Sequence, residues 1–186
     1  IDANGTVNQD ALVSQYDWNL DLRGELEVGF PDGQETVQDL ITTSDGHLLL
    51  VGGTTEVDPQ KNGANGGVLD TDQTDIWQVK ITPQNNEIVW QKRYGFTGQD
   101  IGIKAIDHNG VYHILAQTDF GREDPSETDI LLIRLNQDGN ILDQHIEDIG
   151  DSDIPTDFQI QQDDSWLILA TTLNGNNGQV SLMEID

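Results

Sequence analysis

The sequence predicts an all-β protein, and three observations favour a β-propeller with four-stranded antiparallel blades. Apolar and polar side chains alternate along short segments such as residues 76–81 and 101–106, as in strands with one buried face. Asn-Gly occurs six times and Asp-Gly three times, and these pairs tolerate the positive φ of tight hairpin turns. Segments 54 residues apart also repeat one another, and about 50 residues in four strands is the size of one propeller blade, with a solenoid as the alternative architecture.

The expected elements recur in the same order along the chain. The opening strand Thr74–Ile81 matches Thr128–Leu135, since both begin with Thr-Asp-Ile and carry a cation in the next-to-last position. The hairpin strand Asp45–Thr54 recurs as Asn109–Thr118 and Asp163–Thr172. Each unit also contains a turn in which glycine is followed by an acid: Gly33-Gln34-Glu35, Gly98-Gln99-Asp100 and Gly150-Asp151-Ser152-Asp153. A unit therefore reads as two strands, this Gly-acid turn and two further strands.

These boundaries predict one domain over residues 1–186 and leave ring closure open. The repeats cover approximately residues 1–55, 73–118 and 127–172, and a closing strand at 179–186 would complete the first unit. Known propellers need about four or more blades to close, which is more than the repeats visible here. A hidden hairpin within residues 8–28, or excision from a longer propeller, is favoured over a ring formed by several chains.

Composition excludes several classes of partner. The 186 residues include 8 Lys+Arg and 34 Asp+Glu, a formal net charge of −26. Nucleic acid is a poor partner, because phosphate binding needs a basic surface. Leu, Ile, Val and Phe make up about 27% of the chain, which is above the roughly 20% below which charged chains stay disordered. The chain is therefore acidic and still able to form a core.

We expect the chain to be exported from the cell. There is no cysteine, so disulfides and thiolate sites are excluded. The longest apolar runs, such as Trp166–Ala170, have about five residues against the roughly 20 of a membrane helix, so no membrane insertion is predicted. The segment Ile1–Gly5 has no initiator Met and no signal pattern, which indicates a processed or excised chain. We expect neighbouring domains in a longer protein.

The second repeat resembles a known family of repeats. Its segments Thr74-Asp75-Ile76-Trp77, Trp90-Gln91-Lys92-Arg93-Tyr94-Gly95, Gly98-Gln99-Asp100 and Asn109-Gly110-Val111-Tyr112 are similar to the SBBP-type β-propeller repeats of secreted and surface bacterial proteins. The resemblance extends from about residue 26 to the C-terminus and departs at Phe96, where a second glycine is usual. It implies an extracellular or cell-surface protein, with the periplasm as an alternative. It implies a shared scaffold and no shared activity.

Calcium is the cofactor that the acidic segments favour, because this ion prefers clustered Asp, Asn and carbonyl oxygens. The candidate ligands lie in two segments: Asp70, Asp72 and Asp75, and Asp148, Asp151 and Asp153. Neither segment is a complete EF-hand loop, and a solvated acidic turn is the simpler interpretation of each. Bound cations would also relieve the repulsion that accompanies a charge of −26.

Aromatic residues are the other candidate site markers, since sugars and peptides bind on aromatic faces. Trp77, Trp90 and Trp166 occupy repeat positions and are expected to pack inside blades. Trp18 lies outside the repeat and, with Tyr16, is the predicted ligand contact.

The function expected from these features is a noncatalytic binding or spacer module for carbohydrate or protein. No catalytic residue is predicted, since the sequence has no nucleophile elbow, phosphate-binding loop or zinc-protease motif, and the four histidines share no ligand spacing. A glycoside hydrolase or lyase with carboxylates in a propeller cleft is one alternative. A calcium-dependent adhesion module is the other.

Overall fold

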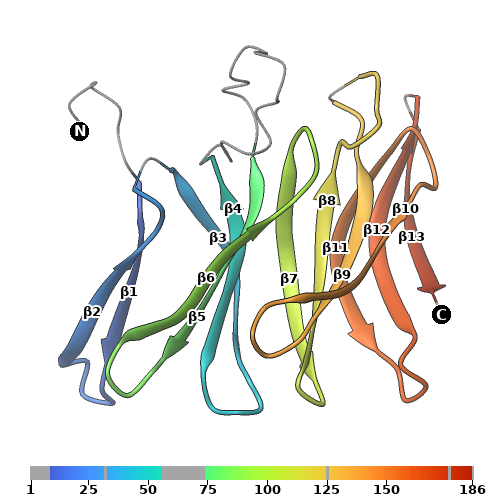
Figure 1. The fold of residues 1–186 in the computed structure, drawn as a ribbon. Helices are drawn as coiled ribbons and strands as arrows, with labels where there is room; N and C mark the ends of the chain where they lie inside the picture. Colours follow the sequence, from blue (N-terminus) through green and yellow to red (C-terminus); the bar gives the residue numbers. More distant parts are fainter. Residues whose placement is uncertain (1–8, 32, 56–73, 125, 176, 186) are drawn as a thin grey trace, which may run out of the picture.

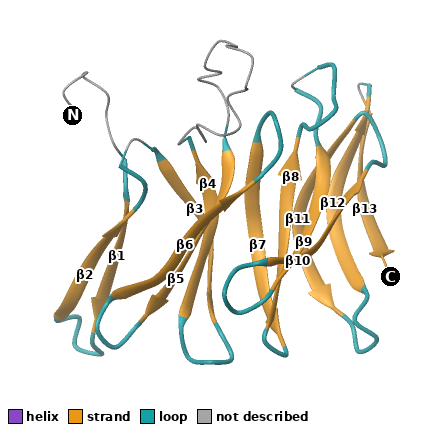
Figure 2. Cartoon of the chain, in the orientation of Figure 1, coloured by secondary structure: helices purple, strands orange, loops and turns teal. Residues whose placement is uncertain are grey.

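The computed structural model describes residues 9–31, 33–55, 74–124, 126–175 and 177–185. These residues form thirteen β-strands and no helix, which confirms the predicted all-β class (Figure 2). The described part of the chain thus contains no helix of the length and apolarity that a membrane crossing requires.

The strands form four antiparallel sheets, which we number in chain order. Sheet 1 contains β1 (Ala11–Tyr16) and β2 (Leu22–Val28). Sheet 2 contains β3 (Glu35–Thr42), β4 (Leu48–Thr54), β5 (Asp75–Thr82) and β6 (Glu87–Tyr94). Sheet 3 contains β7 (Asp100–His108), β8 (Val111–Thr118), β9 (Asp129–Leu135) and β10 (Ile141–Glu147). Sheet 4 contains β11 (Ser152–Ile160), β12 (Trp166–Asn174) and β13 (Asn177–Ile185).

The sheets lie side by side in chain order, with sheet 1 and sheet 4 on opposite sides of the array (Figure 1). The hairpin expected within residues 8–28 is confirmed as β1 and β2. The expected closing strand instead pairs with β12 as a local hairpin, in which Asn174 is opposite Asn177. Such a short connection favours pairing with the preceding strand over a distant one. The described strands therefore form an open array and not a closed ring.

The Gly-acid turns separate the sheets, so the sequence repeats are shifted by half a unit relative to them. Gly98-Gln99-Asp100 leads from β6 in sheet 2 to β7 in sheet 3. A repeating sequence carries no mark of where a structural unit begins, and hydrogen bonding between strands decides it. The hairpin turns do follow the sequence signals: Asn109 and Gly110 join β7 to β8 with φ of 56° and 82°.

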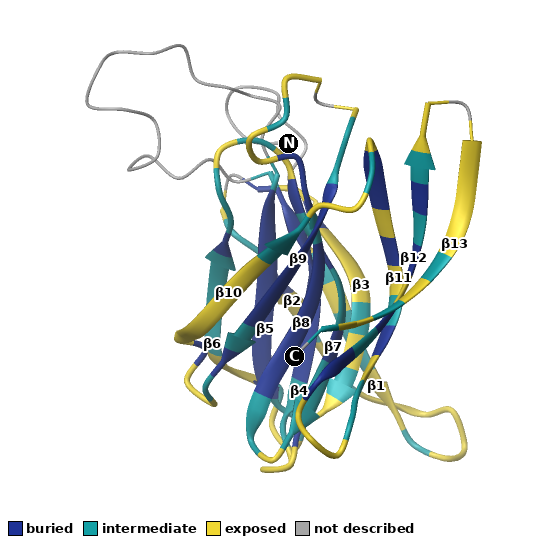
Figure 3. Ribbon diagram, turned by 90° about the vertical axis from the view of Figure 1, so that its right-hand side faces the viewer, coloured by how far each residue is buried: buried dark blue, intermediate teal, exposed yellow. Residues whose placement is uncertain are grey.

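Each sheet packs face to face on the next, and we call the three contacts junctions 1, 2 and 3. The face turned toward the following sheet is the forward face, and the opposite one is the back face. The buried residues of each junction come from both sheets. Strands β5, β8 and β9, in the middle of the two central sheets, are buried along most of their length (Figure 3). Junction 1 buries Val28, Leu50, Trp77, Val79 and Ile81; junction 2 buries Leu49, Val51, Ile76, Tyr94, Ala105, Tyr112, Ile114, Ala116, Leu131, Ile133 and Leu135; junction 3 buries Leu115, Ile130, Leu132, Phe158, Trp166, Ile168 and Ala170.

The first strands of sheets 2, 3 and 4 carry irregularities at equivalent positions, where the pairing register shifts just before Asp39, Lys104 and Asp157. These residues connect neighbouring sheets. Asp39 Oδ2 accepts a hydrogen bond of 2.9 Å from the Ala105 amide, and Lys104 Nζ lies 2.5 Å from Asp157 Oδ1. Charges and bulges on such edge strands also hinder unwanted strand pairing.

Candidate functional site

Every junction contains a pair of acids at equivalent positions. One acid stands at or directly before the first residue of a strand, as Asp10, Asp75 or Asp129, and the other is the first or second residue of the next sheet, as Glu35, Asp100 or Asp153. All of them except Asp10 are buried. In the second set, each acid is also paired across its sheet with a buried threonine: Thr54, Thr118 or Thr172.

The second acid of each pair holds the chain where it crosses between sheets. Glu35 Oε1 accepts a hydrogen bond of 3.2 Å from the Phe30 amide. Asp100 Oδ2 accepts one of 2.5 Å from Phe96, and Asp153 Oδ2 accepts one of 2.7 Å from Ile149. These carboxylates replace the water that the turn amides would otherwise bind, since buried amides need partners. Their role in the fold is structural.

Glycine provides the room for these acids in junction 2. A Cβ on Gly95 would lie 2.5 Å from Asp100 Oδ2 and 2.6 Å from Asp75 Oδ1. Gly29 stands in the same relation to Asp10 and Glu35 in junction 1, with distances of 2.3 and 2.5 Å. The glycines are therefore required by the close approach of two carboxylates.

Junction 3 differs, because Asp148 follows β10 where Gly95 follows β6. Carboxylate oxygens of Asp129, Asp148 and Asp153 lie within 4.8 Å of one another, so this cluster could hold a metal ion. Arg122 extends into the cluster: its Nη2 contacts Asp129 and lies 2.8 Å from Asp148, and its Nε donates to Asp129 at 3.0 Å. Asp153 Oδ1 is buried and has no hydrogen-bond partner in the described part of the structure.

The charges of this cluster affect one another. Burial raises the pKa of Asp129 and outweighs the opposing hydrogen bonds from Arg122. Hydrogen bonding to Asp129 in turn raises the pKa of Arg122, which is positively charged at any ordinary pH. Three carboxylates are a suitable donor set for a hard cation such as Ca²⁺. Arg122 already supplies one positive charge to them.

The structure brings together two of the predicted metal ligands, Asp148 and Asp153. Asp75 is buried in junction 2 beside Asp100, and Asp151 is exposed, where its Oδ2 accepts a hydrogen bond of 2.5 Å from Gly175. Asp70 and Asp72 lie outside the described residues. Asp129 was missed, although it opens a Thr-Asp-Ile strand in the repeat position of Asp75.

A second candidate site lies between sheets 3 and 4, at the opposite end of β9 from Asp129. Two hollows of about 360 and 270 Å³ both include Arg134 and Asp164, and we call them together the polar groove. Six of the residues that line it carry the chemistry discussed below: His108, His113, Arg134, Asp143, Asp164 and Trp166.

The groups of the polar groove are paired. Arg134 Nε lies 2.9 and 2.8 Å from the two oxygens of Asp143, and His108 Nε2 lies 3.2 Å from Asp164 Oδ1. Hydrogen bonding to Asp143 raises the pKa of Arg134. Burial lowers the pKa of His113, whose ring meets Trp166 edge-on with centroids 5.0 Å apart. The groove therefore contains both donors and acceptors beside apolar side chains such as Leu132, Trp166 and Ile185.

The equivalent space in junction 2 is filled by a turn of the chain itself. Lys80 has the repeat position of Arg134, and its Nζ lies 3.3 Å from the Gln137 carbonyl in the β9–β10 turn. Trp90 Nε1 donates to the same oxygen at 3.0 Å, and Tyr94 donates to Gly139 at 2.7 Å. Among the described residues, sheet 4 has no fourth strand and hence no such turn. Within the described residues, no such turn fills the groove.

The predicted ligand contacts Tyr16 and Trp18 lie in sheet 1, at the other end of the array from the polar groove. Tyr16 is the last residue of β1, and Trp18 lies in the turn between β1 and β2. Asp17 accepts hydrogen bonds from the amides of Asn19 at 2.8 Å and Asp21 at 3.0 Å, which shapes the turn. Trp18 is 97% exposed on this turn, so its ring is accessible to a ligand. Of the other tryptophans, Trp77 and Trp166 are buried and Trp90 packs against the core of junction 2, as expected.

Comparison with models of known protein families gave no match to this chain, and comparison with curated proteins gave none either.

Proposed function

We propose that the chain is a noncatalytic binding or spacer module of an exported or cell-surface bacterial protein, and that its polar groove binds a segment of a protein ligand. The proposal rests on a difference between junctions 2 and 3. A turn that presents carbonyl oxygens to Lys80 and Trp90 fills the first junction, and the same space beside Arg134 is open in the second. A peptide with similarly placed carbonyls fits the chemistry of the groove.

The pairing within the groove favours binding over hydrolysis. A glycosidase needs one protonated carboxyl as general acid and a second carboxylate about 5 to 10 Å away. Both oxygens of Asp143 accept hydrogen bonds from Arg134, so both are already engaged by a cation. Asp164 pairs with His108. These acids can orient a ligand, and neither has the apolar setting of a general acid.

The test uses a synthetic peptide with the sequence of residues 134–142, which contains the β9–β10 turn. In ¹⁵N NMR titrations we expect shifts of amides around Arg134, His108 and Asp164, and Arg134→Gln should weaken the affinity at least tenfold. Arg23→Gln is the matched control, since Arg23 forms a similar exposed pair with Asp17 in sheet 1. If the peptide causes no shifts while an oligosaccharide panel does, the ligand is a carbohydrate. Cleavage of any glycan would contradict the noncatalytic proposal.

A second candidate function is calcium-dependent adhesion, which the cluster of Asp129, Asp148 and Asp153 favours. Calcium bound to the folded chain would raise its melting temperature, and a chelator would lower it again. Asp148→Asn should abolish this response, whereas Asp151→Asn, outside the cluster, should leave it intact. No response in the unaltered chain means that Arg122 alone neutralises the cluster, and this candidate then fails.

The propeller architecture is part of the proposal. Support comes from two four-stranded antiparallel sheets stacked face to face and from the resemblance to SBBP-type repeats. The expected export and the partnership with neighbouring domains rest on that resemblance and on the acidic, cysteine-free composition.

A further inference from the structure

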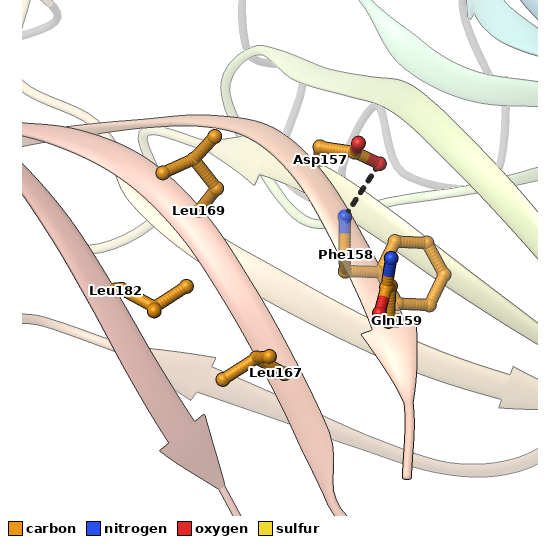
Figure 4. A pocket seen from close by; sticks show the side chains of 6 residues that line it. All are labelled: Asp157, Phe158, Gln159, Leu167, Leu169 and Leu182. Atoms are coloured by element: carbon orange, nitrogen blue, oxygen red, sulfur yellow. Dashed lines mark hydrogen bonds between the residues drawn. The ribbon is translucent and has the colours of Figure 1, made fainter.

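The forward face of sheet 4 exposes a strip of large apolar side chains. Leu182 and Val180 on β13 are 67% and 77% exposed, and Leu169 on β12 lies directly opposite Leu182. A hollow of about 200 Å³ lies over strands β11, β12 and β13, and Leu167, Leu169 and Leu182 form the apolar part of its lining (Figure 4). Exposed apolar strips of this kind mark contact surfaces in soluble proteins.

The same positions are buried inside the array. In sheet 3, Leu115 pairs with Leu132 in the register in which Leu169 pairs with Leu182. Leu132 is 4% exposed, and Ile130, the counterpart of Val180, is fully buried, because sheet 4 covers both. Sheet 4 therefore has large apolar residues on a face that no described sheet covers, at positions that are buried in sheet 3.

The back face of sheet 1 shows the complementary departure. Gln9 and Gln34 form the parallel bridge that Thr74 and Gln99 form in the next junction, which aligns β1 with β5. By this alignment Leu12 and Tyr16 correspond to Trp77 and Ile81, two fully buried residues of sheet 2. Leu12 and Tyr16 are 57% and 55% exposed.

We propose that a second copy of this chain docks head to tail, with the back face of its sheet 1 on the forward face of sheet 4. Every junction between the described sheets joins a back face to a forward face, and the two faces that no described sheet covers are one of each kind. The intermolecular contact continues the packing already established three times in the molecule. The hollow beside Leu182 is a suitable recess for an apolar side chain such as Tyr16. This contact uses a different surface from the polar groove and does not depend on it.

Electrostatics opposes this association and makes it salt-dependent. Each copy carries a formal charge of −26, and repulsion between like-charged copies is screened over about 8 Å at physiological ionic strength and less at higher salt. Head-to-tail contacts either close into rings or extend into chains. Both arrangements require the same two faces.

Sedimentation velocity of the 186-residue chain, at several concentrations in 0.15 M and 0.5 M NaCl, tests the proposal. We expect association that increases with salt. Leu182→Glu disables the forward face and Leu12→Glu the back face, so each variant alone should be monomeric. Mixed together, they keep one undamaged face of each kind and should form a heterodimer. Val89→Glu, an exposed position on β6 away from both end faces, is the control and should associate normally.

Circular dichroism shows whether each variant remains folded, and the exposure of both positions makes unfolding unexpected. A chain that is monomeric at all concentrations and salt conditions overturns the proposal. So does a Leu12→Glu variant that still dimerises alone, because that result indicates two forward faces in contact. Peptide binding in the groove is measured separately, and either result there leaves this conclusion unaffected.

Discussion

Junctions 2 and 3 both place carboxylates close together, but the residues around these carboxylates differ. Both contain two buried acids, Asp75 and Asp100 in one and Asp129 and Asp153 in the other, and the second acid of each pair holds a turn between sheets. Junction 2 leaves room for them with Gly95. Junction 3 adds a third acid at that position and brings in the guanidinium of Arg122.

At the equivalent position, junction 2 has a residue without a Cβ, and junction 3 has a third acid that contacts a guanidinium. A glycine avoids the clash that any Cβ would cause, and it adds no charge. An aspartate at the same position increases the negative charge, which a nearby cation must offset.

Arg122→Gln is expected to have the largest effect, because it leaves three carboxylates close together without their cation. Removing one partner of a buried ion pair typically destabilises a protein by about 3 to 5 kcal/mol. Because Asp148 is exposed, we expect the lower end of this range, a decrease of about 3 kcal/mol in the free energy of unfolding measured with urea. Arg23→Gln, in the exposed pair with Asp17, should lose less than about 1 kcal/mol. The double variant Arg122→Gln/Asp148→Gly, which makes junction 3 resemble junction 2, should recover part of the loss. Equal stability of Arg122→Gln and the unaltered chain would contradict the role of charge.

Gly95→Ala is the second largest change, because its Cβ would meet two carboxylates. Distances of 2.5 and 2.6 Å require Asp100 and Asp75 to move, and Asp100 is held by the Phe96 amide. Overpacking of this kind typically destabilises by about 1 to 3 kcal/mol, and we expect about 2 kcal/mol by urea unfolding. A loss no larger than that of Asp148→Ala, at the equivalent position in junction 3, would show that space is not limiting.

The titration of Asp129 gives a smaller and pH-dependent effect. Because burial raises its folded-state pKa above the ordinary 3.8, the folded chain binds this proton more tightly than the unfolded chain. The contribution of Asp129 to stability is therefore present below pH 3.8 and is lost as the pH rises through its folded pKa. Carboxyl ¹³C NMR should find this pKa above 3.8 and higher still in Arg122→Gln. A value at or below 3.8 would mean that Arg122 outweighs burial.

Asp148→Ala should have the smallest effect, because this residue already has a Cβ and its side chain is exposed. Loss of its contact with Arg122, 2.8 Å long, should change the free energy of unfolding by less than about 1 kcal/mol. The same variant reports on metal binding, since it removes one carboxylate of the cluster. A large loss of stability would identify Asp148 as a main partner of Arg122.

Local patterns were sufficient to predict several elements of the fold. The alternation along residues 76–81 predicted the strand β5, and Asn109-Gly110 predicted the β7–β8 turn, because both signals act between residues that are near in sequence. The expectation of a single buried face was wrong for β5, because sheets pack on both of its faces and bury Gln78 and Lys80 as well. The Gly-acid turns were found as repeats. Their structural place, at the boundary between sheets, depended on strand pairing and was not predicted.

The candidate sites were predicted less completely, because they combine residues that are distant in sequence. Asp148 and Asp153 are near each other in the chain, and sequence proximity was enough to nominate them. Asp129 and Arg122 reach the same cluster from the preceding sheet, so only packing places them there. The polar groove likewise joins His108, Arg134 and Asp164 from three separate segments.

The sequence by itself determined the strand-rich class, the hairpin turns and the acidic character of the chain, since composition, side-chain alternation and turn chemistry are local properties. Tertiary structure alone decided that β13 pairs with β12, that the sheets form an open array, and that Arg122 meets three aspartates. It also decided which copy of a repeated apolar position is covered. Leu132 and Leu182 are the same residue type at the same repeat position, and only the presence of a neighbouring sheet separates burial from exposure.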